Sequence, residues 1–221
     1  MLARNRWKIL ALTIALLLVI SGIVAYFVPV LKVRDIAVTG NVQVSAEEIQ
    51  AASGIIPGDN VVRVRENEVA SRVATIPWVA KVSVQRTFPT SVEINVVERQ
   101  AILFTKRSDG EHLIDESAIP FVIDSPPPGV VELSGQQEDK REVLLPAVGI
   151  VKALDPQNRA DLERIDARSA YEFTLYFKGG KEVYWGSADQ SHDKALATKT
   201  VLQRDGRKWN VSAPGLVTLQ P

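Results

Sequence analysis

The sequence contains no cysteine and only two histidines. Without cysteine the protein has no disulfide, no thiol nucleophile and no Cys-ligated zinc, although this does not identify its compartment. His112 and His192 lie in unrelated predicted elements, whereas a zinc site needs three or four ligands at suitable spacing. The sequence also lacks a G-x-S-x-G elbow, an S-x-x-K motif and a P-loop. We therefore expect no catalytic residue, no metal site and no cofactor.

Net charge is absent as well, because 26 Lys and Arg residues balance 26 Asp and Glu residues. Nothing in this balance indicates a nucleic-acid partner. The carboxylate groups at Asp109/Glu111 and at Asp115/Glu116 have the composition of a glycosidase pair. Solvated charges in turns explain these groups more simply, so we expect no small-molecule substrate.

One long segment carries no charge at all. Residues 9–28 are twenty uncharged residues, enough for a helix to cross roughly 30 Å of hydrocarbon. A cleaved signal peptide is the alternative, but its apolar region spans about 7–15 residues and ends at a small-x-small site. The best candidate site, Ile23-Val24-Ala25, has a bulky first residue. We therefore predict an uncleaved transmembrane helix at residues 9–30.

Basic residues before this segment set its predicted orientation. An excess of Lys and Arg marks the cytoplasmic side of a membrane helix, and a Trp at the end of the helix marks the interface. These topology residues are Arg4, Arg6 and Lys8, with Trp7 at the interface. We expect a cytoplasmic tail at residues 1–8 and a single-pass type II protein of the cell membrane, with its bulk outside the cytoplasm.

Residues 32–100 have the pattern of a small α+β domain. "RDIAVTGN" predicts a short strand, and "VSAEEIQAASG" predicts a helix. That helix has a capping box at Ser45 and Glu48, a hydrophobic staple at Val44 and Ile49, and a stop at Gly54. "ENEVASRVATIP" predicts a second helix that ends at a proline.

A hairpin closes this predicted domain. "IPWVAKVSVQRTFPTSVEINVVERQ" contains two runs that alternate between apolar and polar residues, on either side of a Phe-Pro turn. The predicted buried positions are Trp78, Ala80, Val82 and Val84, then Val92, Ile94 and Val96. One apolar side predicts a half-buried antiparallel pair. The order is β-α-α-β-β, a three-stranded sheet covered by two helices.

Residues 101–221 predict a mixed, strand-dominated unit with peripheral helices. "AILF", "EHLID" and "PFVID" predict short strands, and "YEFTLYFKGGKEVYWG" predicts a hairpin in which Tyr171, Phe173, Leu175 and Phe177 face one way. "QQEDKREVLLPAVGIVKALDP" is partly helical, with Pro146 in a kink or a first turn. A helix opens at Ser187 and closes at Gly206, and "KWNVSAP" and "GLVTLQP" are two last strands.

The sequence resembles the FtsQ/DivIB family of bacterial division proteins along nearly the whole chain. The motifs that carry the resemblance are "VTGN" with its capped helix, "IPWVAKVSVQRTFPTSVEINVVERQ", "VYWGSADQSHDKA" and "WNVSAPGLVTLQ". The residues that define the hairpin motif are Pro77, Trp78, Val79, Phe88, Pro89, Glu98 and Arg99. The resemblance implies a POTRA domain at residues 32–100 and a β domain at residues 101–221.

The resemblance also implies a non-enzymatic scaffold at the division septum. Family members bind the bitopic proteins FtsB and FtsL and connect early division proteins to the septal synthases FtsW and FtsI. Recruitment belongs to the POTRA domain, and FtsB adds a strand to the last strand of the β domain, here residues 215–220 beside residues 209–214. The implied contact residues are Trp209, Val211, Ser212, Gly215, Leu216, Val217, Thr218 and Leu219.

Two alternatives stay open at this point. An anchored enzyme that modifies the cell wall would need a nucleophile, a metal set or an acid pair that the sequence does not offer. A POTRA protein of a transport or assembly system would continue into a barrel of many strands of about ten residues. This sequence has neither that length nor that pattern.

Overall fold

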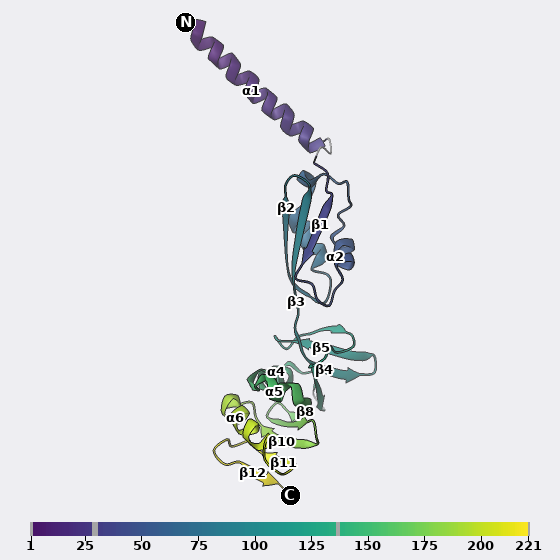
Figure 1. The fold of residues 1–221 in the computed structure, drawn as a ribbon, viewed down its shortest axis with the longest axis vertical. Helices are drawn as coiled ribbons and strands as arrows, with labels where there is room; N and C mark the ends of the chain where they lie inside the picture. Colours follow the sequence, from purple (N-terminus) through teal and green to yellow (C-terminus); the bar gives the residue numbers. More distant parts are fainter. Residues whose placement is uncertain (1, 28–30, 136–137, 221) are drawn as a thin grey trace. The chain divides into compact units, whose positions relative to one another are not determined.

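The computed structural model describes residues 2–27, 31–135 and 138–220, and the chain forms two compact units, residues 1–98 and 99–221 (Figure 1). Both helices and strands occur in each unit, which confirms the predicted α+β class. The elements of the first unit are α1 (Leu2–Phe27), β1 (Asp35–Thr39), α2 (Ala46–Ser53), η1 (Val61–Arg63), α3 (Glu66–Val73), β2 (Val79–Thr87) and β3 (Ser91–Glu98).

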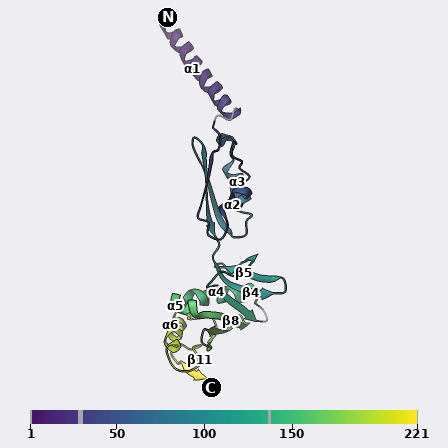
Figure 2. The same cartoon turned by 45° about the vertical axis from the view of Figure 1, so that its right-hand side comes forward.

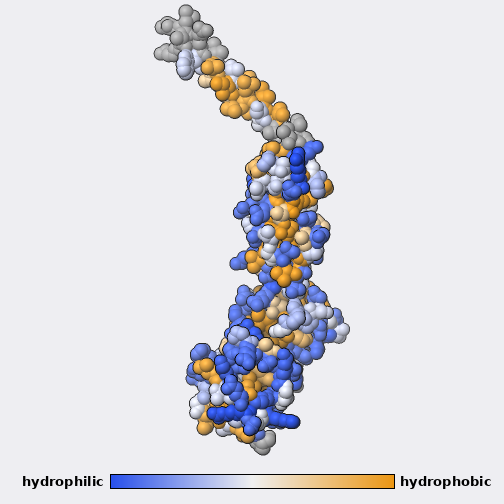
Figure 3. Space-filling view, in the orientation of Figure 1, coloured by the Kyte–Doolittle hydropathy of each residue, from blue (hydrophilic) through white to orange (hydrophobic). Residues whose placement is uncertain are grey.

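Helix α1 covers the charge-free run. The described middle of this helix carries mostly apolar side chains (Figure 3), and the side chain of Trp7 is 77% exposed. Among the residues that the structure describes, no helix is both long enough and apolar enough to cross a membrane. The predicted transmembrane helix is therefore not supported by the structure and stays a prediction. Residues 28–30 and the side chains of Arg4, Arg6 and Lys8 lie outside the described part.

The first unit is built around the central strand β3. This strand pairs in parallel with β1 and antiparallel with β2, so the sheet order is β1-β3-β2. Its alternate residues Val92, Ile94 and Val96 are buried, as the hairpin pattern predicts. Helices α2 and α3 supply Ile49 and Val69 to the same core. The predicted order of strands and helices is confirmed.

The ends of α2 follow the predicted capping chemistry. The Ser45 hydroxyl accepts a hydrogen bond from the Glu48 N–H at 3.1 Å, and both staple residues, Val44 and Ile49, are buried. Gly54 ends the helix with a φ of 66°, the left-handed conformation that glycine adopts without steric cost.

The predicted alternation in the first run of the hairpin was wrong at its start. Trp78 precedes β2 and is half-buried, Val79 is buried, and Ala80 is exposed. The register shifts between Val79 and Lys81, and this irregularity puts Val79 in the core and Ala80 outside it. Trp78, before the strand, still packs against the core. Phe88, in the turn, is 57% exposed and lies outside the core.

The Glu98 carboxylate fixes the loop that leads into α2. It accepts hydrogen bonds from the backbone N–H groups of Val42 at 2.9 Å, Gln43 at 2.8 Å and Val44 at 2.9 Å. Three consecutive donors converge on one ionised group, an arrangement stronger than three neutral hydrogen bonds. The Val-Glu-Arg part of the hairpin motif therefore connects the end of β3 to the start of α2.

In the described part of the second unit, nine strands form a single sheet with the order β12-β11-β10-β9-β8-β7-β4-β5-β6. Its helices lie together on one side of these strands (Figures 1 and 2). Its elements are β4 (Ala101–Arg107), β5 (Gly110–Asp115), β6 (Pro120–Ile123), β7 (Val131–Gly135), α4 (Arg141–Ala153), α5 (Pro156–Asp161), β8 (Leu162–Ser169), β9 (Glu172–Phe177), β10 (Lys181–Gly186), α6 (Ser191–Leu202), β11 (Lys208–Asn210) and β12 (Thr218–Gln220).

The core of this unit lies between the helices and one face of the sheet. Trp185, Phe173 and Phe177 are its largest fully buried side chains. They pack with the buried face of α4, which includes Leu144 and Ile150. The helices therefore cover the middle strands of the sheet on this side.

Several predictions for this unit need correction. Helix α6 begins at Ser191, not Ser187, because the Ser187 hydroxyl bonds to Asp189 and Gln190 occupies the N-cap position. Tyr171 is 78% exposed because it lies in the turn before β9. Pro146 lies in the interior of α4, so the first-turn alternative was wrong, while the kink stays a prediction. Residues 136–137 of the predicted helical segment lie outside the described residues.

We expect Glu98→Ala to loosen the β1–α2 loop of the full-length protein by about 1–3 kcal/mol, since hydrogen bonds to a charged group are lost. Backbone hydrogen exchange measured over residues 35–53 checks this. Glu93→Ala is the matched control, because Glu93 is an exposed residue of the same strand. Equal exchange rates in the two variants would contradict the assigned role of Glu98.

Candidate partner-binding edge

Strand β12 ends the nine-stranded sheet at the C-terminal end of the described chain (Figure 1). It pairs antiparallel with β11, with Trp209 opposite Leu219 and Asn210 opposite Thr218. Among the described residues no strand pairs with its other side, and all three of its residues are exposed. An open edge of this kind offers unpaired N–H and C=O groups to an added strand.

The opposite edge of the sheet is less suited to accept a strand. Strand β6 begins with Pro120, which has no N–H to donate. The Arg99 guanidinium lies 5.8 Å from the ring centroid of Phe121. Of the two ends of this sheet, β12 is therefore the better template for strand addition.

The structure divides the predicted contact residues into two groups. Trp209 and Val211 are buried in the core, so their side chains do not reach a partner. Four other predicted contact residues are exposed, namely Gly215, Leu216, Thr218 and Leu219.

The predicted edge is also shorter than expected. Residues 215–217 form the connection to β12 and not part of the strand, and the Leu216 N–H donates to the Ala213 carbonyl at 2.9 Å. Ser212 is half-buried, and its hydroxyl and its N–H both donate to the Asn210 Oδ1 atom. Val217 is half-buried against the core.

The side chain of Leu219 lies on the helical side of the sheet. Its partner in the register, Trp209, is buried in the core that the helices cover. Its Cδ1 atom also lies so close to Gly206, in the loop after α6, that a Cβ on Gly206 would be 2.5 Å away. Gly206 has a φ of 121°, a conformation that L side chains rarely adopt.

The opposite face of the sheet is polar and lies outside the helical core. One row crosses seven strands through paired positions: Phe104, Glu132, Arg164, Tyr176, Glu182, Lys208 and Gln220. Neighbours in this row interact, since Arg164 stacks 4.2 Å from the ring centroid of Tyr176 and Lys208 lies 3.9 Å from Glu182. A hydrogen bond to Glu132 raises the pKa of Lys106 beside this row. The row ends at Gln220, on the open strand.

A groove lies beside the open edge, between α6 and the connection to β12. It has a volume of about 510 Å³ and is bounded by one stripe of α6 from Asp193 to Val201, by Arg204 just after the helix, and by Pro214, Gly215 and Val217. We name it the α6 groove. On the buried side of α6, burial lowers the pKa of Lys194, whose Nζ donates to the Ser187 carbonyl at 2.9 Å.

The open edge is short for a binding site made of backbone alone. Its three residues offer about two or four hydrogen bonds to an added strand, depending on which of them face the open side, each worth about 1 kcal/mol net. A micromolar complex requires about 8 kcal/mol, and association itself costs several more. Burial of one leucine-sized side chain adds about 1.5–3 kcal/mol. Side chains beside β12 must therefore supply most of the affinity of any strand that adds there.

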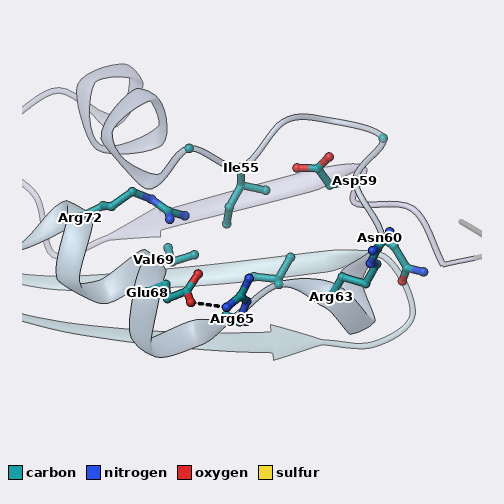
Figure 4. Close-up of a pocket in the computed structure, with 11 residues that line it drawn as sticks. Ile55, Asp59, Asn60, Arg63, Arg65, Glu68, Val69 and Arg72 are labelled. Atoms are coloured by element: carbon teal, nitrogen blue, oxygen red, sulfur yellow. Dashed lines mark hydrogen bonds and ion pairs between the residues drawn. The ribbon is translucent and has the colours of Figure 1, made fainter. Parts of the chain in front are cut away.

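The first unit has a separate cleft of about 460 Å³ near α3 (Figure 4). Three arginines line it, and each of them already has a contact within the unit. Arg72 donates twice to the Ser53 carbonyl, Arg65 pairs with Glu68, and Arg63 lies 5.3 Å from the ring centroid of Tyr26. Because each arginine already has a contact, the positive charge of the cleft does not indicate a bound ligand.

Elsewhere in the part of the chain that the structure describes, we find no cluster of side chains that forms a metal site. No three of its His, Asp and Glu residues come together as metal ligands. His112 pairs with Asp109 at 2.9 Å, and this contact lowers the pKa of the Asp109 carboxyl.

The fold and this edge define a class of protein. A β-α-α-β-β unit of this kind is a POTRA domain, and here it is followed by a strand-rich unit with an open terminal strand.

Comparison with known proteins agrees with this class. The family model described as "POTRA domain, FtsQ-type" matches residues 31–99. Cell division protein FtsQ of Corynebacterium glutamicum is 37% identical over 96% of this chain and 99% of its own length. FtsQ of Mycobacterium tuberculosis is 34% identical over 90% of this chain and 64% of its own length. The chain therefore belongs to the FtsQ family of cell division proteins.

One solved structure is also similar, the extracytoplasmic domain of DivIB from Geobacillus stearothermophilus. It covers 49% of this chain and 98% of its own, with 16% identity and a TM-score of 0.36. This similarity is too low to support a conclusion about the fold.

We expect Gly206→Ala to displace Leu219 and loosen β12, because the added Cβ meets the Leu219 side chain. Hydrogen exchange over residues 218–220 should become faster. Gly179→Ala is the matched control, since Gly179 has a φ of 79° but no atom within 4 Å of an added Cβ. Both variants share a backbone strain of about 1–3 kcal/mol, so an effect on β12 that is equal in both would contradict the contact.

Proposed function

We propose that this protein is a non-enzymatic scaffold of the division machinery, held at the septum by protein contacts. Its partners are an FtsB-like and an FtsL-like bitopic protein, and through them it connects early division proteins to the FtsW and FtsI synthases. The FtsB-like partner adds a strand to β12. Membership of the FtsQ family supports the division role, and the resemblance of the sequence supports the named partners.

The observation that carries the binding proposal is the open side of β12. This strand has one neighbour, β11, and its three residues are exposed on a sheet whose helical face is otherwise closed. Main-chain hydrogen bonds to an added strand give affinity, and side chains at alternate positions give selectivity. Strand addition needs no catalytic group, which suits a chain in which no nucleophile, metal set or acid pair is evident from the sequence.

We also propose that residues 9–30 anchor the protein as a single membrane span. The support is the sequence: twenty uncharged residues follow Arg4, Arg6 and Lys8. This topology puts residues 1–8 in the cytoplasm and the chain after Lys32 outside it, where the septal wall is made.

Leu219→Lys is expected to weaken binding of the FtsB-like partner by about tenfold or more, because it places a charge where an apolar contact must form. Leu145→Lys is the matched control on α4, since Leu145 is 51% exposed and Leu219 is 55% exposed. Pull-down from cells that produce both full-length proteins measures the effect. Equal loss in both variants, or loss in neither, would overturn the assignment of this edge.

Proline at Thr218 and at Leu219 separates strand pairing from partner binding. The N–H groups of neighbouring strand residues point in opposite directions, so one of these two faces β11 and the other faces the open side. The proline that removes the open N–H should abolish binding and leave the melting temperature of the protein nearly unchanged. The other should lower the protein's stability. Full binding by both variants would exclude backbone pairing at β12.

A fluorescent fusion to the N-terminus should form a septal band in dividing cells. Leu219→Lys should keep this band, because the family resemblance assigns recruitment to the POTRA domain and not to the edge. A fusion to residues 1–31 alone is the control and should label the membrane evenly. An even membrane signal from the full-length protein would contradict the division role.

A further inference from the structure

The α6 groove is continuous with the open edge of the sheet. Val217 lines the groove and packs against the helix-covered core, and Leu219 is on the same side of the sheet, opposite the buried Trp209. A strand added to β12 directs half of its own side chains to this same side. The groove is therefore within reach of a segment that pairs with β12.

The floor of the groove is apolar and open to solvent. Leu196 is 54% exposed although it lies in the middle of α6, and Val201, which also lines the groove, is buried. Two further leucines near the edge, Leu216 and Leu219, are 72% and 55% exposed. Apolar groups gathered beside an unpaired strand are typical of a protein interaction site.

The two ends of the groove carry opposite charges. Asp193 lies in the first turn of α6 and Arg204 lies just after its last turn, eleven residues along the chain, or roughly 16 Å at the helical rise. Neither side chain has an ion-pair partner in the described ranges. Both signs also suit the helix dipole, so each charge is stable without a ligand. A bound segment that places a basic residue near Asp193 and an acidic residue near Arg204 is nonetheless favoured over a segment that lies in the reverse direction.

We propose that the partner segment that adds to β12 also fills the α6 groove. This inference rests on the proposed function and deepens it. The segment inserts a large apolar side chain over Leu196, with an acidic residue toward Arg204 and a basic residue toward Asp193. The groove thereby supplies the side-chain burial that a three-residue edge lacks, and its charged ends select the direction in which the segment lies.

Site-specific crosslinking in the full-length protein tests this. A benzophenone amino acid replaces Leu196 in the groove, Thr218 on the edge, or His192 as the control, which is an exposed residue of α6 that does not line the groove. The expected result is that positions 196 and 218 capture the same partner, identified by mass spectrometry, and that position 192 captures none.

Other outcomes overturn the proposal in distinguishable ways. Capture at position 218 alone, or capture of a second copy of this chain or of a different protein at position 196, removes the groove from the partner site while the edge stands. Capture at neither position removes both the groove and the proposed edge function.

Charge reversal gives a second, independent readout. Arg204→Glu should weaken partner binding by about tenfold, and the loss should shrink as salt rises, because the contact is electrostatic. Arg207→Glu is the matched control, since Arg207 is an exposed arginine of the same loop that does not line the groove. If the two charge reversals weakened binding equally, the effect would be a general electrostatic attraction. The assignment of Arg204 to an acidic residue of the partner segment would then be overturned.

Discussion

A sheet that does not close on itself has two end strands, and this constraint shapes the second unit. Each end strand has unpaired N–H and C=O groups on one side. At one end of this nine-stranded sheet, β6 begins with a proline that has no donor. At the other end, β12 is exposed, and Leu219 rests against Gly206. The open end is thus the part of the sheet that remains available for a new contact.

Two adjacent residues of the hairpin motif stabilise the two units separately. The Glu98 carboxylate binds three consecutive N–H groups before α2 in the first unit. Arg99 pairs at 2.7 Å with Asp115 in the second unit, and Asp115 also accepts hydrogen bonds from the N–H groups of Ser117 and Ile119. The motif that makes the family recognisable thus serves the fold, and the proposed contact lies elsewhere.

Helix α6 has two faces with different roles. One face completes the core with Ala195 and Val201 and buries Lys194, whose charge is tied to the carbonyl of Ser187. The other face leaves Leu196 in solvent beside the connection to β12. An apolar side chain in this position adds little to the folded chain alone, which is why the groove, together with the edge, is the surface we propose for the partner.

Strand alternation and capping chemistry are local, so the sequence alone determined the β-α-α-β-β order, the ends of α2 and the buried face of β3. It also placed the last strand near the C-terminus. The register shift after Val79 and the length of β12 depend on which strand each residue meets, and only the tertiary structure decided them. The same holds for the site. Leu196 and Arg204 come together with Val217 because α6 packs beside the connection to β12, across residues distant in sequence. Helical periodicity marks which residues share a face, but it does not identify the neighbour that covers that face or leaves it open.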